Sequence, residues 1–162
     1  MGCGAKPRGF VMKVLILTVG RLKDKRVSSL AGEYLARIRP GLISVEIVPD
    51  GNGAPEERVE REGREILQKL RPKDRLILLD ESGGSYGSEA FAVLLSKEMD
   101  TSSGRVVMAI GGPWGVSASV KERADLLLSL SPMTFPHELC FLFLTEQLYR
   151  VFSILQGSKY HH

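Results

Sequence analysis

Residues 105–115, RVVMAIGGPWG, form an apolar run that leads directly into a turn of three glycines and one proline. A buried strand that ends in such a turn brings bare backbone to the rim of an α/β sheet, where small ligands usually bind. Two later features of the sequence support interpreting this stretch as part of a ligand site. Residues 130–136 form a second loop before a long helical pattern, and the chain ends in Tyr160, His161 and His162.

Apolar runs and helical spacings alternate on both sides of this stretch. Strands are expected at residues 14–19, 44–48, 75–79, 106–110 and 126–130. Helices are expected at 27–39, 56–70, 117–124 and 137–155, and another begins at Ser88, which reads as a capping serine. The alternation predicts one α/β domain with a mostly parallel sheet and helices on both faces. We expect this domain at residues 12–162, after an unstructured extension at 1–11.

The charge of the chain is unevenly distributed. Residues 1–39 contain nine Lys/Arg against two Asp/Glu, which is +7, so the remainder carries −4 of the formal net charge of +3. A basic segment on a nearly balanced body favours a phosphate-rich partner. A solvated helix face with a basic tail explains the same pattern. The charged helix at 56–70 is expected to present only such a solvated face.

Cysteine, metal and nucleotide motifs exclude several classes of protein. Cys3 and Cys140 form no disulfide framework and no zinc pattern, so a reducing cytoplasm and no metal are expected. Cys140 reads as a small buried apolar residue. There is no GxxxxGK[ST] motif, which excludes a P-loop NTPase. The turn at 111–115 is not GxGxxG, and Pro113 removes an amide that a pyrophosphate would need.

The last helix is apolar on nearly every side, although Glu146 and Arg150 interrupt it. These charges argue against a membrane span. A helix that is apolar all round must be covered all round, and a second subunit is the natural cover. We therefore expect a homodimer. Glu146 and Arg150 lie four residues apart, which predicts an ion pair, while Arg150 reaching the substrate from the dimer interface is the alternative.

Three loops follow three of the expected strands, at residues 78–81, 110–113 and 130–135. Such loops offer backbone amides and carbonyls to a flat heterocycle, which requires no charged side chain. The order of LLDESG, IGGPWG and LSLSPMTFPHELCFLFLTEQLYRVFSILQGSKYHH resembles the RlmH-type methyltransferases of the SPOUT superfamily. The resemblance runs from Met12 to the last residue.

The resemblance implies the fold, the cofactor and the substrate. It implies a C-terminal trefoil knot, a homodimer built on the terminal helices, and methylation of N3 of a pseudouridine in 23S rRNA on the assembled ribosome. The cofactor would be S-adenosyl-L-methionine, held in the knotted loops. The residues that would line it are Leu79, Gly111, Leu130, Ser131, Pro132, Met133, Thr134 and Phe135.

The resemblance also implies catalytic roles near the C-terminus. His161 is the candidate general base for the N3 proton, and Tyr160 positions the target base. His162 stands where the family usually has Arg or Lys, and a histidine is mostly neutral at pH 7. Ser82 likewise replaces a family Arg, and Trp114 replaces an acidic residue. His137, at the start of the last helix, has either a structural or a catalytic role.

Two other functions remain open on the sequence. A non-catalytic ribosome-binding module of the same fold would be consistent with the departures at His162 and Ser82. A tRNA methyltransferase is disfavoured because no RNA-binding domain is appended. Recognition of ribosome shape would involve phosphate contacts. The side chains expected to make them are Lys23, Lys25, Arg26, Arg37 and Arg39.

Overall fold

The computed structural model describes residues 14–160, which form five strands and five helices in strict alternation. The elements are β1 (Val14–Val19), α1 (Lys25–Arg37), β2 (Ile43–Val48), α2 (Pro55–Lys69), β3 (Arg75–Ser85), α3 (Ser88–Thr101), β4 (Val106–Ile110), α4 (Ala118–Arg123), β5 (Leu126–Ser129) and α5 (His137–Leu155). All strands pair in parallel in the order β2-β1-β4-β3-β5. This confirms the predicted α/β class.

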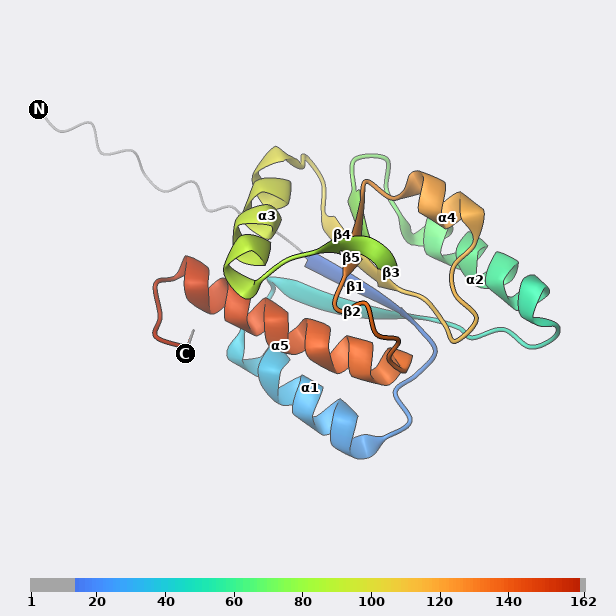
Figure 1. Cartoon of the computed structure of the whole chain (residues 1–162), viewed down its shortest axis with the longest axis horizontal. Coiled ribbons are helices and arrows are strands. Elements are labelled where there is room, and N and C mark those ends of the chain that lie inside the picture. Colours follow the sequence, from blue (N-terminus) through green and yellow to red (C-terminus); the bar gives the residue numbers. More distant parts are fainter. Residues whose placement is uncertain (1–13, 161–162) are drawn as a thin grey trace, which may run out of the picture.

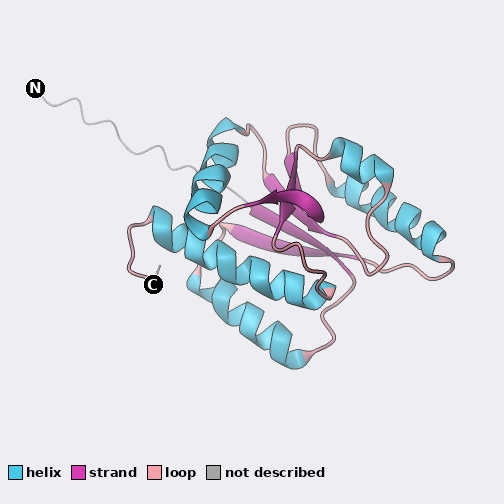
Figure 2. Cartoon of the chain, viewed as in Figure 1, coloured by secondary structure: helices cyan, strands magenta, loops and turns pink. Residues whose placement is uncertain are grey.

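Helices cover both faces of the sheet, as the sequence predicts (Figures 1 and 2). Side chains of a strand alternate between its faces. Val14 and Ile16 of β1 therefore join α1, α3 and α5 in one apolar core. Leu15 and Leu17 join α2 and α4 in the other. Because both faces are covered, β1 is fully buried and has the nearly continuous apolar sequence of a parallel strand, interrupted only by Thr18.

Strand β3 is longer than the sequence predicts. The sequence predicts a strand that ends at Leu79 and a loop at residues 78–81, but β3 continues to Ser85. The register with β5 shifts between Leu79 and Gly84, so the strand bends past β5 before it pairs with Leu128 again. The Gly-rich sequence conceals this pairing because glycine is rare in regular strands.

Two further predictions about local structure are wrong. Ser88 does not cap α3: the N-cap is Gly87, and the Ser88 hydroxyl donates to Gln147 Oε1 of α5 at 2.8 Å. Helix α2 is not only a solvated face. Glu62 is 3% exposed and accepts a hydrogen bond from the Gly51 N–H at 3.1 Å, so one carboxylate of this charged helix supports the β2–α2 loop.

Gly83 is required where β3 passes β5. A Cβ at this position would lie 2.5 Å from the Leu127 carbonyl carbon, which is backbone and has little freedom to move. Gly83→Ala is therefore expected to lower the free energy of unfolding by about 1–3 kcal/mol, the usual cost of overpacking. Urea denaturation followed by circular dichroism measures this free energy.

Gly32→Ala is the control, because a Cβ there meets nothing within 4 Å and α1 should gain stability. An unchanged midpoint for Gly83→Ala would contradict the close approach.

Among residues 14–160, no helix has the length and apolar character needed to cross a membrane. The same residues contain no group of three or more His, Cys, Asp or Glu side chains arranged to hold a metal ion.

Candidate functional site

A cavity of about 780 Å³ opens at the carboxyl ends of β3, β4 and β5. Because parallel strands end at the same edge of the sheet, the segments that follow these strands meet there. The first part of its lining comes from Leu79–Ser82 of β3 and from the end of β4 with the turn after it, residues 110–113, 115 and 116. The β5–α5 loop and the first turn of α5 complete it.

The turn after β4 brings backbone to the cavity wall. Gly115 has a φ of +88° and donates its N–H to the Gly112 carbonyl at 3.1 Å, which closes the turn. A Cβ at Gly111 would lie 2.9 Å from Val116 Cγ2. A Cβ at Gly112 would lie 3.0 Å from the buried Glu62 carboxylate. The glycines therefore permit a tight turn whose peptide groups line the cavity.

The β5–α5 loop is held by its own short side chains. The Ser131 hydroxyl accepts the Met133 N–H at 3.0 Å, and Ser129 Oγ donates to the Ser131 carbonyl at 2.9 Å. The Thr134 hydroxyl donates to Glu81 Oε2 of β3 at 2.9 Å, which links the two walls of the cavity. The loop thus has a defined shape rather than the freedom of an ordinary connection.

Carboxylates give one wall of the cavity a negative charge. Asp80 accepts hydrogen bonds from the Ser82 hydroxyl and, at 2.9 Å, from the Ser82 N–H. It also pairs with Lys121 Nζ of α4 at 3.2 Å. The Ser82 hydroxyl, the Ser82 N–H and Lys121 hold the pKa of Asp80 below its ordinary value against the opposing effect of burial. Lys121 neutralises this charge, so Glu81 remains the unneutralised carboxylate of the wall.

His137 and Cys140 of α5 also line the cavity. The Nε2 atom of His137 is buried and has no hydrogen-bond partner among the described residues. A buried polar atom without a partner is costly, and a bound ligand can satisfy it. Cys140 is half-buried rather than buried as the sequence predicts, and burial raises the pKa of its thiol.

A second cluster of candidate residues lies near the other end of α5. The Glu146–Arg150 ion pair predicted from their spacing is present, with Arg150 Nη2 2.6 Å from Glu146 Oε1. The Arg150 guanidinium lies 5.2 Å from the ring centre of Tyr160, and Tyr149 meets Tyr160 edge to face at 4.4 Å. Burial and a hydrogen bond with Tyr34 raise the pKa of Tyr160, so this phenol stays protonated at neutral pH.

The two clusters lie far apart within one chain. His137 and Arg150 are 13 residues apart on α5, which corresponds to about 20 Å along the helix axis. Figure 1 shows the β5–α5 loop at one end of α5 and the segment after Leu155 at the other. Arg150 and Tyr160 do not line the cavity. Among residues 14–160, a single subunit therefore does not bring Arg150 or Tyr160 to the cavity that the predicted cofactor residues line.

Most of the predicted cofactor residues line the cavity. The cavity wall contains seven of the eight predicted cofactor residues, Leu79, Gly111, Leu130, Ser131, Met133, Thr134 and Phe135, whereas Pro132 is exposed and absent from it. His161 and His162 lie outside the described residues. Lys121 and Cys140 also line the cavity, and no sequence pattern predicts this, because each residue is part of an ordinary helical pattern.

The sequence profile described as "Predicted SPOUT methyltransferase" matches residues 12–161, nearly the whole chain. The chain belongs to the SPOUT methyltransferase family. It is 42% identical over 156 residues to a ribosomal RNA large subunit methyltransferase H of Porphyromonas gingivalis. The aligned region covers 93% of this chain and 99% of that protein. A relative of the same description from Pelotomaculum thermopropionicum is 43% identical over 157 residues, covering 92% and 98%. The family resemblance noted from the motifs is thus confirmed.

Solved structures support the SPOUT fold at low sequence identity. A probable methyltransferase from Bordetella pertussis has a TM-score of 0.55 and 13% identity, and the match covers 87% of this chain and 95% of that one. The ribosomal RNA small subunit methyltransferase E of Neisseria gonorrhoeae, bound to S-adenosyl methionine, has a TM-score of 0.52 and 11% identity, covering 89% and 66%.

Proposed function

We propose that this SPOUT methyltransferase transfers a methyl group from S-adenosyl-L-methionine to N3 of a pseudouridine in 23S rRNA, on the assembled ribosome in the cytoplasm. The observation that carries the proposal is the match of nearly the whole chain to relatives described as ribosomal RNA large subunit methyltransferase H. The cavity at the carboxyl edge of β3, β4 and β5 supports it, since this is where a family cofactor would bind.

The lining of the cavity fits S-adenosylmethionine in three respects. Apolar side chains and the backbone of the glycine turn line the cavity, as suits an adenine. The Glu81 carboxylate favours a positively charged ligand. His137 Nε2 is a buried polar atom that lacks a partner within the described chain. When bound, the cofactor supplies an activated methyl group, so the residues have mainly to align it with the target base.

The residues near the C-terminus are proposed to act on the target base. His161 accepts the proton of N3, because nitrogen must lose that proton before or during attack. Tyr160, a phenol at neutral pH, donates a hydrogen bond to a carbonyl of the base. Arg150 holds Tyr160 by contact with its ring and adds positive charge beside it. His162 supplies a weaker positive charge than Arg or Lys would.

A homodimer completes this site in our proposal. The cavity and Tyr160 lie at opposite ends of a helix that spans about 20 Å between His137 and Arg150. A two-fold axis that sets two α5 helices antiparallel would bring the end of one beside the beginning of the other. The exposed apolar residues of α5, Phe143 and Leu155, would then be covered.

We further propose that residues 12–162 form one domain with a C-terminal trefoil knot, preceded by an extension at 1–11. Support comes from the order of the sheet, in which β5 lies at the edge beside β3 while α5 returns to pack against α1 and α3. The close approach of Gly83 to Leu127 is where the two segments pass each other.

Nucleoside analysis tests the proposed reaction. The purified chain is incubated with labelled S-adenosylmethionine and ribosomes that lack the modification, and the rRNA is digested for mass spectrometry. We expect one labelled nucleoside, N3-methylpseudouridine. Ribosomes that carry uridine at the same position are the control and should remain unlabelled. Label on a uridine, or on carbon, would contradict the proposed chemistry.

Cys140 provides a test of the cofactor site that does not depend on activity. Burial raises the pKa of this thiol, so its alkylation at pH 7 should be slower than that of a free thiol. Because Cys140 lines the cavity, saturating S-adenosylmethionine should slow alkylation by about tenfold or more. Mass spectrometry of a Cys3→Ser protein measures the rate. A rate that the cofactor leaves unchanged would place the cofactor elsewhere.

A further inference from the structure

A second cavity, of about 470 Å³, lies at the opposite edge of the sheet from the cofactor cavity. It is formed by the loop before β3 and the loop before β4. Its lining residues are Arg71, Pro72, Lys73, Asp74, Ser103, Gly104 and Arg105. Arg75, at the start of β3 beside this cavity, lies four residues before Leu79, which lines the cofactor cavity. Four residues of a strand span about 13 Å, so the two cavities are separate.

The floor of this cavity is a buried ion pair. Asp74 is almost fully buried and pairs with Arg105, with 2.7 Å between Oδ2 and Nη2. Asp74 also accepts the N–H groups of Arg71 at 2.9 Å and Arg105 at 3.0 Å. Burial alone would raise the pKa of Asp74, but the hydrogen bonds from Arg105 and Arg71 hold it below its ordinary value. The negative charge of Asp74 is therefore fully engaged by its neighbours.

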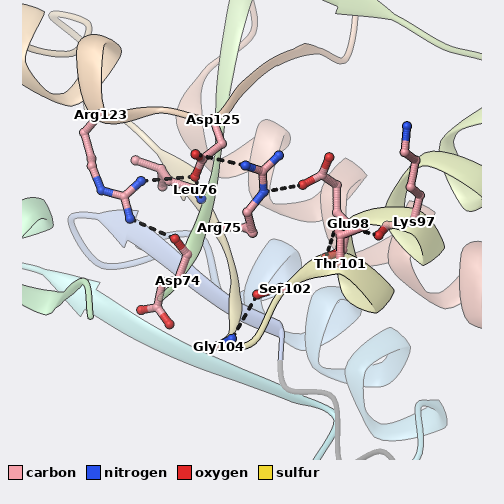
Figure 3. Close-up of polar contacts among 10 residues, drawn as sticks. All are labelled: Asp74, Arg75, Leu76, Lys97, Glu98, Thr101, Ser102, Gly104, Arg123 and Asp125. Atoms are coloured by element: carbon pink, nitrogen blue, oxygen red, sulfur yellow. Dashed lines mark hydrogen bonds and ion pairs between the residues drawn. The ribbon is translucent and has the colours of Figure 1, made fainter. Parts of the chain in front are cut away.

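The other arginines of this edge are also engaged (Figure 3). Arg75 bonds to Glu98 at 2.7 Å and to Asp125 at 3.1 Å. Arg123 bonds to Asp125 at 3.1 Å and to the Asp74 carbonyl at 2.8 Å. These pairs fix the starts of β3 and β5 relative to α3 and α4.

Arg71 and Lys73 are the exception. Both are exposed, and neither side chain takes part in an ion pair with any described residue. With Asp74 neutralised by Arg105, the cavity carries a net charge of +2 from these two residues. The loops that hold them pack closely, since a Cβ at Gly104 would lie 2.5 Å from the Lys73 carbonyl oxygen, and the Arg105–Asp74 hydrogen bonds join them. The cavity is thus a preformed cationic pocket.

We infer that this pocket binds the phosphodiester backbone of the ribosomal RNA substrate, as a second point of contact remote from the methylated base. Arginine and lysine donors suit phosphate oxygens, and the Ser103 hydroxyl at the rim can add a further donor. A single nucleotide cannot reach from the cofactor cavity to this edge, whereas folded RNA can. The inference rests on the proposed function, because it assumes an rRNA substrate.

Charge removal tests the pocket. The pocket variant carries Arg71→Gln and Lys73→Gln. The control variant carries Arg64→Gln and Lys97→Gln, which remove the same charge from exposed residues outside the pocket. Methyl transfer to ribosomes that lack the modification gives KM and kcat for each protein. Binding to a 23S rRNA transcript is measured across a series of salt concentrations. Calorimetry with S-adenosylmethionine confirms that each variant is folded and binds the cofactor.

We expect the pocket variant to raise KM for ribosomes several-fold with kcat unchanged. Its slope of log affinity against log salt should be less steep by about 1.5, which corresponds to roughly 0.7–0.9 for each of two lost phosphate contacts. The control variant should match the wild type in both measurements. Equal slopes and equal KM for the two variants would overturn the inference. A wild-type protein that transfers no methyl group would instead contradict the proposed function itself.

Discussion

Replacing His161 with alanine is expected to lower methyl transfer to ribosomes by about 10²–10⁴-fold, the usual contribution of a positioned general base. The N3 proton would then have no acceptor held beside it, while the cofactor cavity at residues 79–140 would be unchanged. Single-turnover transfer of labelled methyl measures the chemical step, and calorimetry measures the affinity for S-adenosylmethionine. We expect the affinity to be that of the wild type.

A second variant makes this result specific. His162→Ala is the matched control, since it removes the neighbouring imidazole and should reduce the rate far less. Full activity of His161→Ala would show that another group accepts the proton.

The second large effect is expected from mixing two inactive proteins. Thr134→Arg places a bulky cation in the cavity wall at an exposed position, so cofactor binding should fail without loss of folding. Tyr160→Phe with His161→Ala disables the groups proposed to act on the base. Each homodimer should be inactive. A mixed dimer, purified through two different tags, should recover about half of the wild-type rate because one of its two sites is intact.

This recovery distinguishes a shared site from a site within one chain. If cofactor and catalytic residues acted within the same subunit, both sites of the mixed dimer would be disabled and no activity would return. The 20 Å or so between His137 and Arg150 along α5 favours the shared site. A mixed dimer as inactive as its parents, with cofactor bound to the subunit that carries Tyr160→Phe, would contradict it.

The fold was predictable where burial determines the sequence. Val14–Val19 and Val106–Ile110 were predicted at their observed bounds because strands buried on both faces are nearly continuous apolar runs, Thr18 being the one polar residue of the two. The end of β3 was not predictable, since its residues 82–84 are Ser-Gly-Gly and only Gly84 of these pairs with β5, after the register shift. Ser88 illustrates a related limit: the sequence shows a hydroxyl at a helix start but not the Gln147 amide oxygen that accepts its hydrogen bond.

The candidate site was predictable in part for a similar reason. Loops after parallel strands must meet at one edge, so residues 110–113 and 130–135 were expected together, and the cavity contains both. His137 and Cys140 reach the cavity because α5 packs against α1 and α3. No local sequence pattern predicts that packing. The separation of Tyr160 from the cavity likewise depends on the length and direction of α5. The catalytic roles of Tyr160, His161, His162 and Arg150 remain predictions.

The most direct test of the central claim is labelled methyl transfer from S-adenosylmethionine to ribosomes that lack the modification, run beside free large subunits and bulk tRNA. Our account predicts label at a single pseudouridine of 23S rRNA in whole ribosomes, with less in free subunits and none in tRNA. Label in tRNA would contradict the proposed substrate. No label in any sample, from a protein that binds the cofactor by calorimetry, would contradict the proposed enzyme and favour a ribosome-binding module of the same fold.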